Sequence, residues 1–346
     1  MKNPIAVLGA GSWGTALAVL LAHNGHEVNL WARNQEQCAT ISADKENKKY
    51  LPGVIIPDQV SLCNNIQEAL SDTEFIVSAV PSHSVREIAQ SICPYVHEGT
   101  IIINTAKGFE PKTHLRLSQV LKEELPDYCH DHIALLSGPS HAEEVGKNLP
   151  TALVVAGDCQ SSAEKVQDIF MNRFFRVYIN LDLIGVELAG ALKNVIALGT
   201  GISDGLGYGD NTKAALITRG LAEITRLGVS FGADDKTFSG LAGLGDLVVT
   251  CTSMHSRNRR AGIQIGQGKP LKQVLSNMGM VVEGVNTTEA AHHLARQAGV
   301  IMPITEQMFQ VLFHGKDPEN AVISLMTRSK THEGEGEMLS SGNDPL

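Results

Sequence analysis

The stretch "IAVLGAGSWGTALAVLLAHNGHEVNLWAR", residues 5–33, decides the fold. A short apolar run leads into Gly9, Gly11 and Gly14, spaced as G-x-G-x-x-G, and then into a helical segment and a second β-like run. In such a unit the first glycine makes the tight turn, the second lets the backbone approach a pyrophosphate, and the third lets helix and strand pack closely. The phosphates would lie at the helix N-terminus, where free N–H groups favour negative charge. The stretch therefore predicts a Rossmann-like dinucleotide site.

The end of the second run indicates which dinucleotide is bound. NAD-specific sites usually place an Asp or Glu there to bind the ribose 2′-hydroxyl. This chain reads "NLWARN", with no acidic residue and with Arg33. A guanidinium suits a 2′-phosphate, which favours NADP over NAD, although an exposed loop arginine would give the same letters. The missing acid also disfavours a methyltransferase, because sites for S-adenosylmethionine tend to use a carboxylate on the ribose.

The rest of the first half repeats the same alternation of strand and helix. The runs "FIVSAV", "TIIINT", "IALLSG" and "TALVVAG" are nearly continuously apolar, and "FFRVYIN" closes the series at Asn180. Such runs predict a doubly wound parallel sheet with helices on both faces, so residues 1–180 form an α/β domain. Residues 181–330 read as long helical segments broken by glycine, which predicts an all-α second domain. The tail, 331–346, has little to bury, and we expect it to be disordered.

Composition narrows the class of partner. The chain has 346 residues, 43% hydrophobic and 19% charged, with a formal net charge of -9. That charge argues against general attraction to nucleic acid or to an anionic membrane, so an anionic substrate needs a local basic cluster. The six cysteines are scattered without a CxxC or a metal-like grouping, which indicates a reducing cytosol and no metal site. No uninterrupted apolar stretch reaches the ~18 to 20 residues of a spanning helix, and we expect a cytoplasmic protein.

The segment "ELAGALKNVIALGTGISDG", residues 187–205, reads as a helix that is apolar or small on every side but carries Lys193. A helix without a polar face is normally buried, and burying an unpaired ammonium costs several kcal/mol. The residues one turn away cannot pair with the lysine. Either its stem reaches the surface, as most helical lysines do, or the charge has a function.

The segment "GDLVVTCTSMHSRNRRAGIQIGQG", residues 245–268, carries three arginines in four positions of an acidic chain: Arg257, Arg259 and Arg260. Ser256 precedes them and is a good helix N-cap, so the first helical turn would offer backbone N–H groups beside Arg257 and Asn258. This chemistry suits a phosphate. A solvated basic face is the alternative, whereas a nucleic-acid patch is disfavoured because no aromatic residues are interleaved.

Together these segments resemble one family, the bacterial NAD(P)-dependent sn-glycerol-3-phosphate dehydrogenases. The likeness covers nearly all of the chain except the tail, in the stretches "GAGSWGTALA", "YLPG", "VPSHSVREI", "NTAKGFE", "LSGPSHAEEV", "GALKNVIALGTGISDGLGYGDNTKAALITRG", "GLGDLVVTCTSMHSRNRR" and "VVEGVNT". The resemblance implies an oxidoreductase that reversibly reduces dihydroxyacetone phosphate to sn-glycerol 3-phosphate, the precursor of glycerophospholipids. It also implies a homodimer.

The resemblance also implies site residues. It implies that Lys193 is the proton donor and acceptor, and Asp246 would orient that lysine or bind a substrate hydroxyl. It places the nicotinamide cofactor on Ser12, Trp13, Arg33, Tyr50, Lys107, Ala142, Arg257, Val281 and Glu283. It places the substrate on Lys107, Gly138, Ser140, Lys193, Asp246, Ser256, Arg257 and Asn258.

Two other functions remain as alternatives. A two-domain dehydrogenase acting on a 3-hydroxy acid also carries a catalytic lysine, but such enzymes typically keep an asparagine four residues later, where this chain has Ala197. A non-catalytic NAD(P)-binding module is the other alternative, and it would not need a buried lysine opposite a phosphate cradle.

Overall fold

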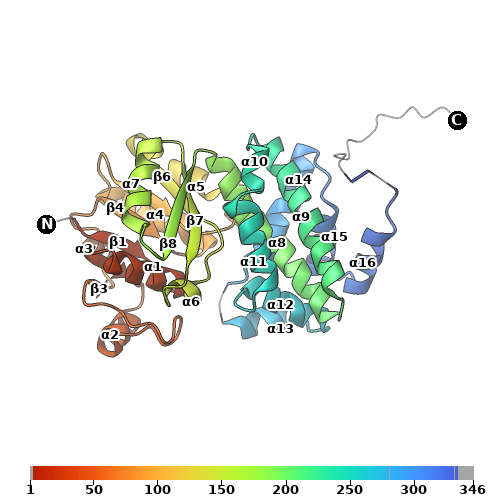
Figure 1. Cartoon of the computed structure of the whole chain (residues 1–346), viewed down its shortest axis with the longest axis horizontal. Coiled ribbons are helices and arrows are strands. Elements are labelled where there is room, and N and C mark those ends of the chain that lie inside the picture. The colour runs from red at the N-terminus through yellow and green to blue at the C-terminus, as the bar shows by residue number, and fades with distance from the viewer. Residues whose placement is uncertain (1–2, 280, 331, 334–346) are drawn as a thin grey trace.

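The computed structural model describes residues 3–279, 281–330 and 332–333, and it divides into a sheet half and a helical half (Figure 1). The expected disordered tail, 331–346, lies outside the described residues except at positions 332 and 333.

The sheet half is built on eight strands in the order β3-β2-β1-β4-β5-β6-β7-β8. The strands are β1 (Ile5–Leu8), β2 (Val28–Trp31), β3 (Val60–Cys63), β4 (Phe75–Ser78), β5 (Ile101–Asn104), β6 (Ile133–Ser137), β7 (Thr151–Gly157) and β8 (Phe175–Asn180). The first six are parallel to their neighbours, whereas β7 runs antiparallel to β6 and parallel to β8.

The sheet departs from the sequence-based expectation in two ways. The edge strand β3, "VSLC", was not predicted, because it is short and lacks a continuous apolar run; only its first and last residues are buried. The last two strands reverse the expected parallel order, because β6 and β7 are joined by a segment with one four-residue helix, α6 (Ala142–Val145). A parallel return needs a longer crossover, usually over a full helix.

Helices cover both faces of the sheet, as predicted for a doubly wound fold. Helices α1 (Ser12–His23), α2 (Gln35–Asp44), α6 and α7 (Gln160–Phe170) contribute to one apolar core, and α3 (Ile66–Ala69), α4 (Val85–Ile92) and α5 (Leu117–Glu124) to the other. Short 3₁₀ turns complete the connections: η1 (Ser82–Ser84), η2 (Cys93–Tyr95) and η3 (Asp127–His132).

The helical half is organised around α8 (Leu183–Gly205), which Figure 1 shows running through the middle of the bundle. This helix is long and apolar enough to cross a membrane, but 94% of its 18-residue apolar window is buried inside the protein. Around it lie α9 (Asp210–Ser230), α10 (Asp235–Phe238), η4 (Leu241–Gly245), α11 (Asp246–Thr252), α12 (Arg257–Gly266), α13 (Leu271–Met278), α14 (Glu283–Ala298), α15 (Pro303–Phe313) and α16 (Pro318–Met326). The all-α second half agrees with the sequence-based prediction.

Helices α8 and α12 pack with their backbones in close contact. A Cβ atom added to Gly201 of α8 would lie 2.2 Å from the Arg259 carbonyl oxygen, and one added to Gly262 of α12 would lie 2.2 Å from the Leu198 carbonyl oxygen. Only glycine permits this approach at both positions. The crossing holds the first turn of α12 beside the middle of α8, where Lys193 lies.

Candidate functional site

The loop between β1 and α1 has a shape that suits a pyrophosphate. Gly9 has a φ of 116°, and a Cβ there would lie 2.7 Å from the Ala79 carbonyl oxygen. A Cβ on Gly14 would lie 1.9 Å from the Gly9 carbonyl oxygen, so helix and strand pack as tightly as predicted. At Gly11, which directly precedes the helix, an added Cβ would meet nothing within 4 Å, so the backbone there is open to a close approach. The residues present therefore fit a dinucleotide.

Arg33 follows β2 and lies on the same edge of the sheet as the glycine loop. Its guanidinium donates to Glu87 Oε2 of α4 over 2.9 Å, and the two side chains are 65% and 62% exposed. Sequence reasoning did not foresee this partner. Because both groups are exposed, the ion pair is weak and a phosphate can compete with Glu87 for the arginine.

Tyr50 lies between α2 and β3, under the Lys49 ammonium, which is 5.0 Å from the ring centroid. Nearby, the Asn47 amide donates to the Ala10 carbonyl oxygen over 3.0 Å and to Thr15 Oγ1 over 2.8 Å. These bonds hold the Tyr50 segment against the nucleotide loop.

The buried lysine of α8 pairs with a carboxylate on another helix, α11. Lys193 is 6% exposed, and its ammonium donates to Asp246 Oδ1 and, over 2.8 Å, to Thr250 Oγ1. Asp246 and Thr250 lie one turn apart on α11. Lys193 therefore does not reach solvent as an unpaired surface lysine would.

Lys107 approaches the same carboxylate from the other half of the molecule. It follows β5, and its ammonium donates to Asp246 Oδ2 over 2.7 Å and to the Gly138 carbonyl oxygen over 2.9 Å. Gly190 of α8 lies beside this approach: a Cβ added there would lie 2.8 Å from Ser137 Oγ and in ordinary contact, 3.7 Å, with the Lys107 Cγ. Two ammonium groups thus share one buried carboxylate.

The electrostatics of this cluster favour proton transfer by Lys193. Burial, together with the charge of Lys107, lowers its pKa from 10.5 to about 8, although Asp246 acts in the opposite direction. Burial alone would raise the pKa of Asp246, but the charges and hydrogen bonds of the two lysines hold it below its usual value. The carboxylate is therefore ionised while the lysine can exist in both protonation states near neutral pH.

The residues expected to bind a phosphate lie at the start of α12. Ser256 is the N-cap, as predicted, and its hydroxyl accepts from the Arg259 N–H over 3.2 Å. Arg257 donates to the Val281 carbonyl oxygen over 3.4 Å, and burial lowers its pKa. Asn258 donates to Asn194 Oδ1 over 2.8 Å, which ties the cradle to the residue after Lys193.

One member of the arginine cluster is directed elsewhere. Arg259 Nη2 lies 2.7 Å from Asp204 Oδ2, and Nη1 donates to the Thr252 carbonyl oxygen over 2.7 Å. Consecutive helical positions point in different directions, so three arginines in four residues cannot all face one ligand. Arg259 therefore links α12 to Asp204 of α8 and to the end of α11.

The remaining predicted residues lie at the junction of the two halves. Gly138 and Ser140 follow β6, where the Ser140 hydroxyl donates to the Gly138 carbonyl oxygen over 2.9 Å, and Ala142 begins α6. Glu283 begins α14, and its carboxylate accepts from the N–H and the hydroxyl of Ser82 in the loop after β4.

Sequence reasoning missed three contributors to this arrangement. Thr250 had a usable signal, because it stands four residues after Asp246 in a helix and therefore on the same face. Asn194 had one too, as a second polar residue on an otherwise apolar helix. Ser82 had none, because its partner Glu283 is 201 positions away.

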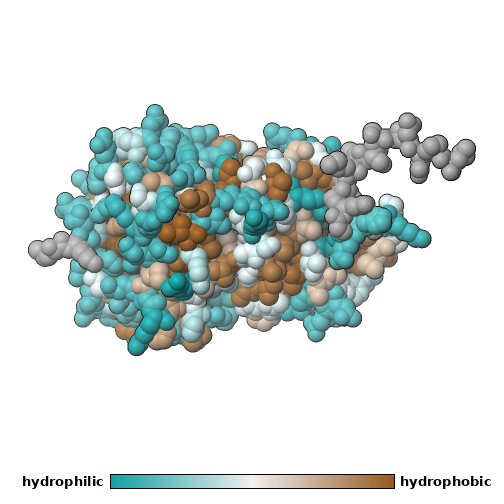
Figure 2. All heavy atoms as spheres, turned by 45° about the horizontal axis from the view of Figure 1, so that its top comes forward, coloured by the Kyte–Doolittle hydropathy of each residue, from teal (hydrophilic) through white to brown (hydrophobic). Residues whose placement is uncertain are grey.

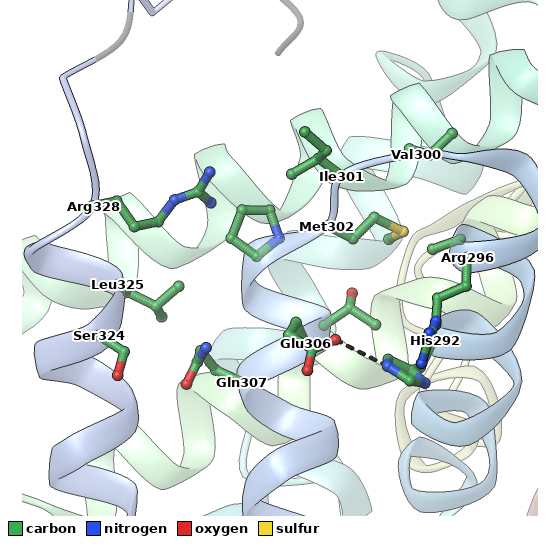
Figure 3. A pocket seen from close by; sticks show the side chains of 13 residues that line it. His292, Arg296, Val300, Ile301, Met302, Glu306, Gln307, Ser324, Leu325 and Arg328 are labelled. Carbon is green, nitrogen blue, oxygen red and sulfur yellow. Dashed lines mark ion pairs between the residues drawn. The ribbon is translucent and has the colours of Figure 1, made fainter. Parts of the chain in front are cut away.

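A cavity of about 390 Å³ lies elsewhere, among α14, α15 and α16 (Figure 3). Arg296 and Arg328 are at its sides, and His292 pairs with Glu306 over 2.9 Å. None of the predicted site residues lines it. Its volume alone therefore does not indicate a catalytic site.

A glycine-rich loop before α1 of a Rossmann-like sheet and a buried lysine on the central helix are features of a nicotinamide-dependent dehydrogenase. Residues 4–163 match the family described as NAD-dependent glycerol-3-phosphate dehydrogenase N-terminus, and residues 182–323 match its C-terminus. The chain belongs to the NAD-dependent glycerol-3-phosphate dehydrogenase family.

Individual relatives agree along nearly all of the chain. The chain is 59% identical over 329 residues to glycerol-3-phosphate dehydrogenase [NAD(P)+] of Desulfitobacterium hafniense, covering 95% of this chain and 92% of the relative. It is 57% identical over 335 residues to the Moorella thermoacetica protein of the same name, covering 97% and 99%. The crystal structure of glycerol-3-phosphate dehydrogenase from Coxiella burnetii superposes with a TM-score of 0.90 at 41% identity, covering 94% and 99%.

Proposed function

We propose that this chain is a glycerol-3-phosphate dehydrogenase, which reversibly reduces dihydroxyacetone phosphate to sn-glycerol 3-phosphate with NADPH or NADH and so supplies glycerophospholipid synthesis. Family membership supports this proposal. The observation that carries it is the Lys193 ammonium, buried on an apolar helix, held by Asp246 and Thr250, and adjoining the arginine cradle at the start of α12.

Lys193 exchanges the proton of the reacting oxygen. When bound, the nicotinamide cofactor supplies the hydride to the ketone carbon, or accepts it in the reverse direction. In reduction the ammonium of Lys193 donates a proton to the oxygen that becomes the hydroxyl, and in oxidation the neutral amine takes that proton back. With a pKa of about 8, Lys193 is neutral in about a quarter of the molecules at pH 7.5, so it can act in both directions of the reaction.

The other assignments divide the site between substrate and cofactor. Arg257, Asn258 and the α12 N-terminus hold the substrate phosphate, with Ser256 as the cap. Lys107, Gly138 and Ser140 border the substrate, while Asp246 orients Lys193. The cofactor is held by Gly9, Gly11, Ser12, Trp13, Gly14, Arg33, Tyr50, Lys107, Ala142, Arg257, Val281 and Glu283.

The test is oxidation of NADH and of NADPH with three substrates side by side: dihydroxyacetone phosphate, unphosphorylated dihydroxyacetone and a ketone bearing a carboxylate. The proposal expects rapid turnover with the first only. Faster turnover with the acidic ketone would indicate a hydroxy acid dehydrogenase, and no cofactor oxidation with any of the three would indicate a binding module.

The organisation in the cell is also a proposal. Residues 1–180 would be the nucleotide domain and 181–330 the substrate domain, acting in the cytoplasm on a small molecule and without nucleic acid. All six cysteines are free, which supports a reducing compartment.

A homodimer is supported by the surface. Figure 2 shows apolar residues gathered near the middle of the molecule, with hydrophilic residues towards both ends. Large exposed apolar side chains near the junction of the two halves include Tyr178, Leu181, Leu244 and Val248. Apolar patches of this kind often mark protein interfaces. Light scattering of the purified chain measures the oligomeric state, and a monomer at micromolar concentration would overturn this part.

A further inference from the structure

Ser82 and Glu283 join the two halves of the molecule at the cofactor side of the site. Ser82 begins η1 after β4, and Glu283 is the first residue of α14. The Ser82 N–H donates to Glu283 Oε1 over 3.1 Å, and the Ser82 hydroxyl donates to Oε2 over 2.6 Å. One residue therefore fixes both oxygens of the carboxylate.

The surroundings leave this carboxylate little freedom. Ser82 is 1% exposed. A Cβ added to Gly108 would lie 3.0 Å from the Ser82 Cβ and 3.2 Å from Glu283 Oε2, so the backbone of Gly108 forms a third wall. Side chains locked by packing and by hydrogen bonds lose less entropy when they bind a ligand.

The carboxylate can still accept further hydrogen bonds. An ionised carboxylate offers about four acceptor positions, and Ser82 uses two of them. The carboxamide of a nicotinamide ring carries two N–H donors of the kind that these remaining positions accept. Arg257 is near enough for the Glu283 carboxylate to act on its charge.

We propose that Ser82 is a positioning residue for the cofactor. It orients Glu283 so that the carboxylate accepts from the nicotinamide carboxamide, and it thereby sets the affinity for the nicotinamide half of the dinucleotide. This inference rests on the proposed function, because it takes Glu283 as a cofactor-binding residue.

Calorimetric titration of Ser82→Ala with NADH and with ADP-ribose, which lacks the nicotinamide, tests the proposal without reference to activity. We expect the Kd for NADH to rise about 3- to 10-fold, as for loss of one pre-oriented side chain, and the Kd for ADP-ribose to stay within about twofold. Ser84→Ala, in the same 3₁₀ turn, is the matched control and should change neither. Ser82→Cys keeps a side chain of similar size but with a weaker hydrogen-bond donor, and it should raise the Kd for NADH in the same way.

A double-mutant cycle shows whether Ser82 acts through Glu283. Glu283→Gln should lower the affinity for NADH, and adding Ser82→Ala to this variant should lower it little further. If Ser82→Ala and Ser82→Cys leave the affinity for NADH unchanged, or lower the affinities for NADH and ADP-ribose equally, the positioning role is wrong while the proposed function stands. If Glu283→Gln itself leaves NADH affinity unchanged, the assignment of Glu283 to the cofactor is wrong as well.

Discussion

Lys107 and Lys193 donate to opposite oxygens of the same carboxylate, Asp246, which is 1% exposed. One lysine comes from the sheet half and the other from the central helix of the helical half. Because two positive charges share one negative charge in a buried site, the ammonium form of Lys193 is less favoured than it would be in a simple ion pair. This arrangement allows Lys193 to lose its proton near neutral pH, as the proposed proton exchange requires.

Replacement of Lys193 tests the catalytic role that we propose for it. Lys193→Met should lower kcat about 100-fold or more, because general acid catalysis contributes about 10² to 10⁴. Asp246 keeps Lys107 as a partner at 2.7 Å, so the carboxylate is not left unpaired. Steady-state kinetics give the loss, and NADH titration and the Tm serve as controls for binding and folding. More than a tenth of wild-type kcat would contradict the assignment.

The pH profile should report the same lysine. A pKa of about 8 predicts that oxidation of sn-glycerol 3-phosphate, which needs the neutral amine, rises with pH through about 8, whereas reduction, which needs the ammonium, falls. Two variants should move this midpoint in opposite directions. Asp246→Asn removes the charge that raises the pKa, and Lys107→Met removes one that lowers it. Midpoints that move together would show that another group controls the profile.

Arg257→Ala should separate the phosphate from the rest of the substrate. The Arg257 guanidinium is partly buried at the N-terminus of α12. Exposed charges are screened within about 8 Å at physiological salt, whereas a partly buried charge is screened less. We expect kcat/KM to fall strongly for dihydroxyacetone phosphate and hardly at all for unphosphorylated dihydroxyacetone. Equal losses for both substrates would mean that Arg257 does not bind the phosphate.

Arg33 and Glu87 together should set the cofactor preference. Arg33→Ala should raise the KM for NADPH several-fold and leave that for NADH nearly unchanged, because a charge-assisted hydrogen bond to a 2′-phosphate contributes at most about 1.5 to 3 kcal/mol and this side chain is exposed. Glu87→Gln, which frees the guanidinium from its ion pair, should lower the KM for NADPH. If both cofactors respond alike to Arg33→Ala, another residue distinguishes them.

Glu223 gives a prediction about stability that is independent of the catalytic site. Its buried carboxylate accepts from the N–H groups of Ile304 and Thr305 at the start of α15, and burial raises its pKa to about 7. Because the folded state holds this proton more tightly than the unfolded state, its contribution is fully present below pH 4.5 and is lost as the pH rises through about 7. The rise in the pKa of Glu223 from 4.5 to about 7 corresponds to about 3 kcal/mol in the free energy of unfolding.

Glu223→Gln cannot ionise, so its free energy of unfolding should depend less on pH between 5 and 8 than that of the wild type. Urea titrations at several pH values measure this slope. An identical slope in both proteins would show that Glu223 does not titrate in this range.

The sequence by itself determined the local features of this protein. Continuous apolar runs identify strands buried on both faces, the glycine spacing identifies the turn before α1, and an apolar segment identifies α8 as a buried helix that carries Lys193. Ser256 was identified as an N-cap from its place before the arginines. Each of these depends on residues within one or two turns of one another, whose burial and hydrogen bonding follow from the helix and strand periods.

Only the tertiary structure decided which groups meet. Asp246 and Thr250 reach Lys193 from 53 and 57 positions away, and Ser82 reaches Glu283 across 201. The same packing directs Arg259 to Asp204 and Arg33 to Glu87. These contacts depend on how whole elements are placed, as in the glycine crossing of α8 and α12, where backbones touch. No local period encodes that placement, because it results from the simultaneous burial of several helices around one core.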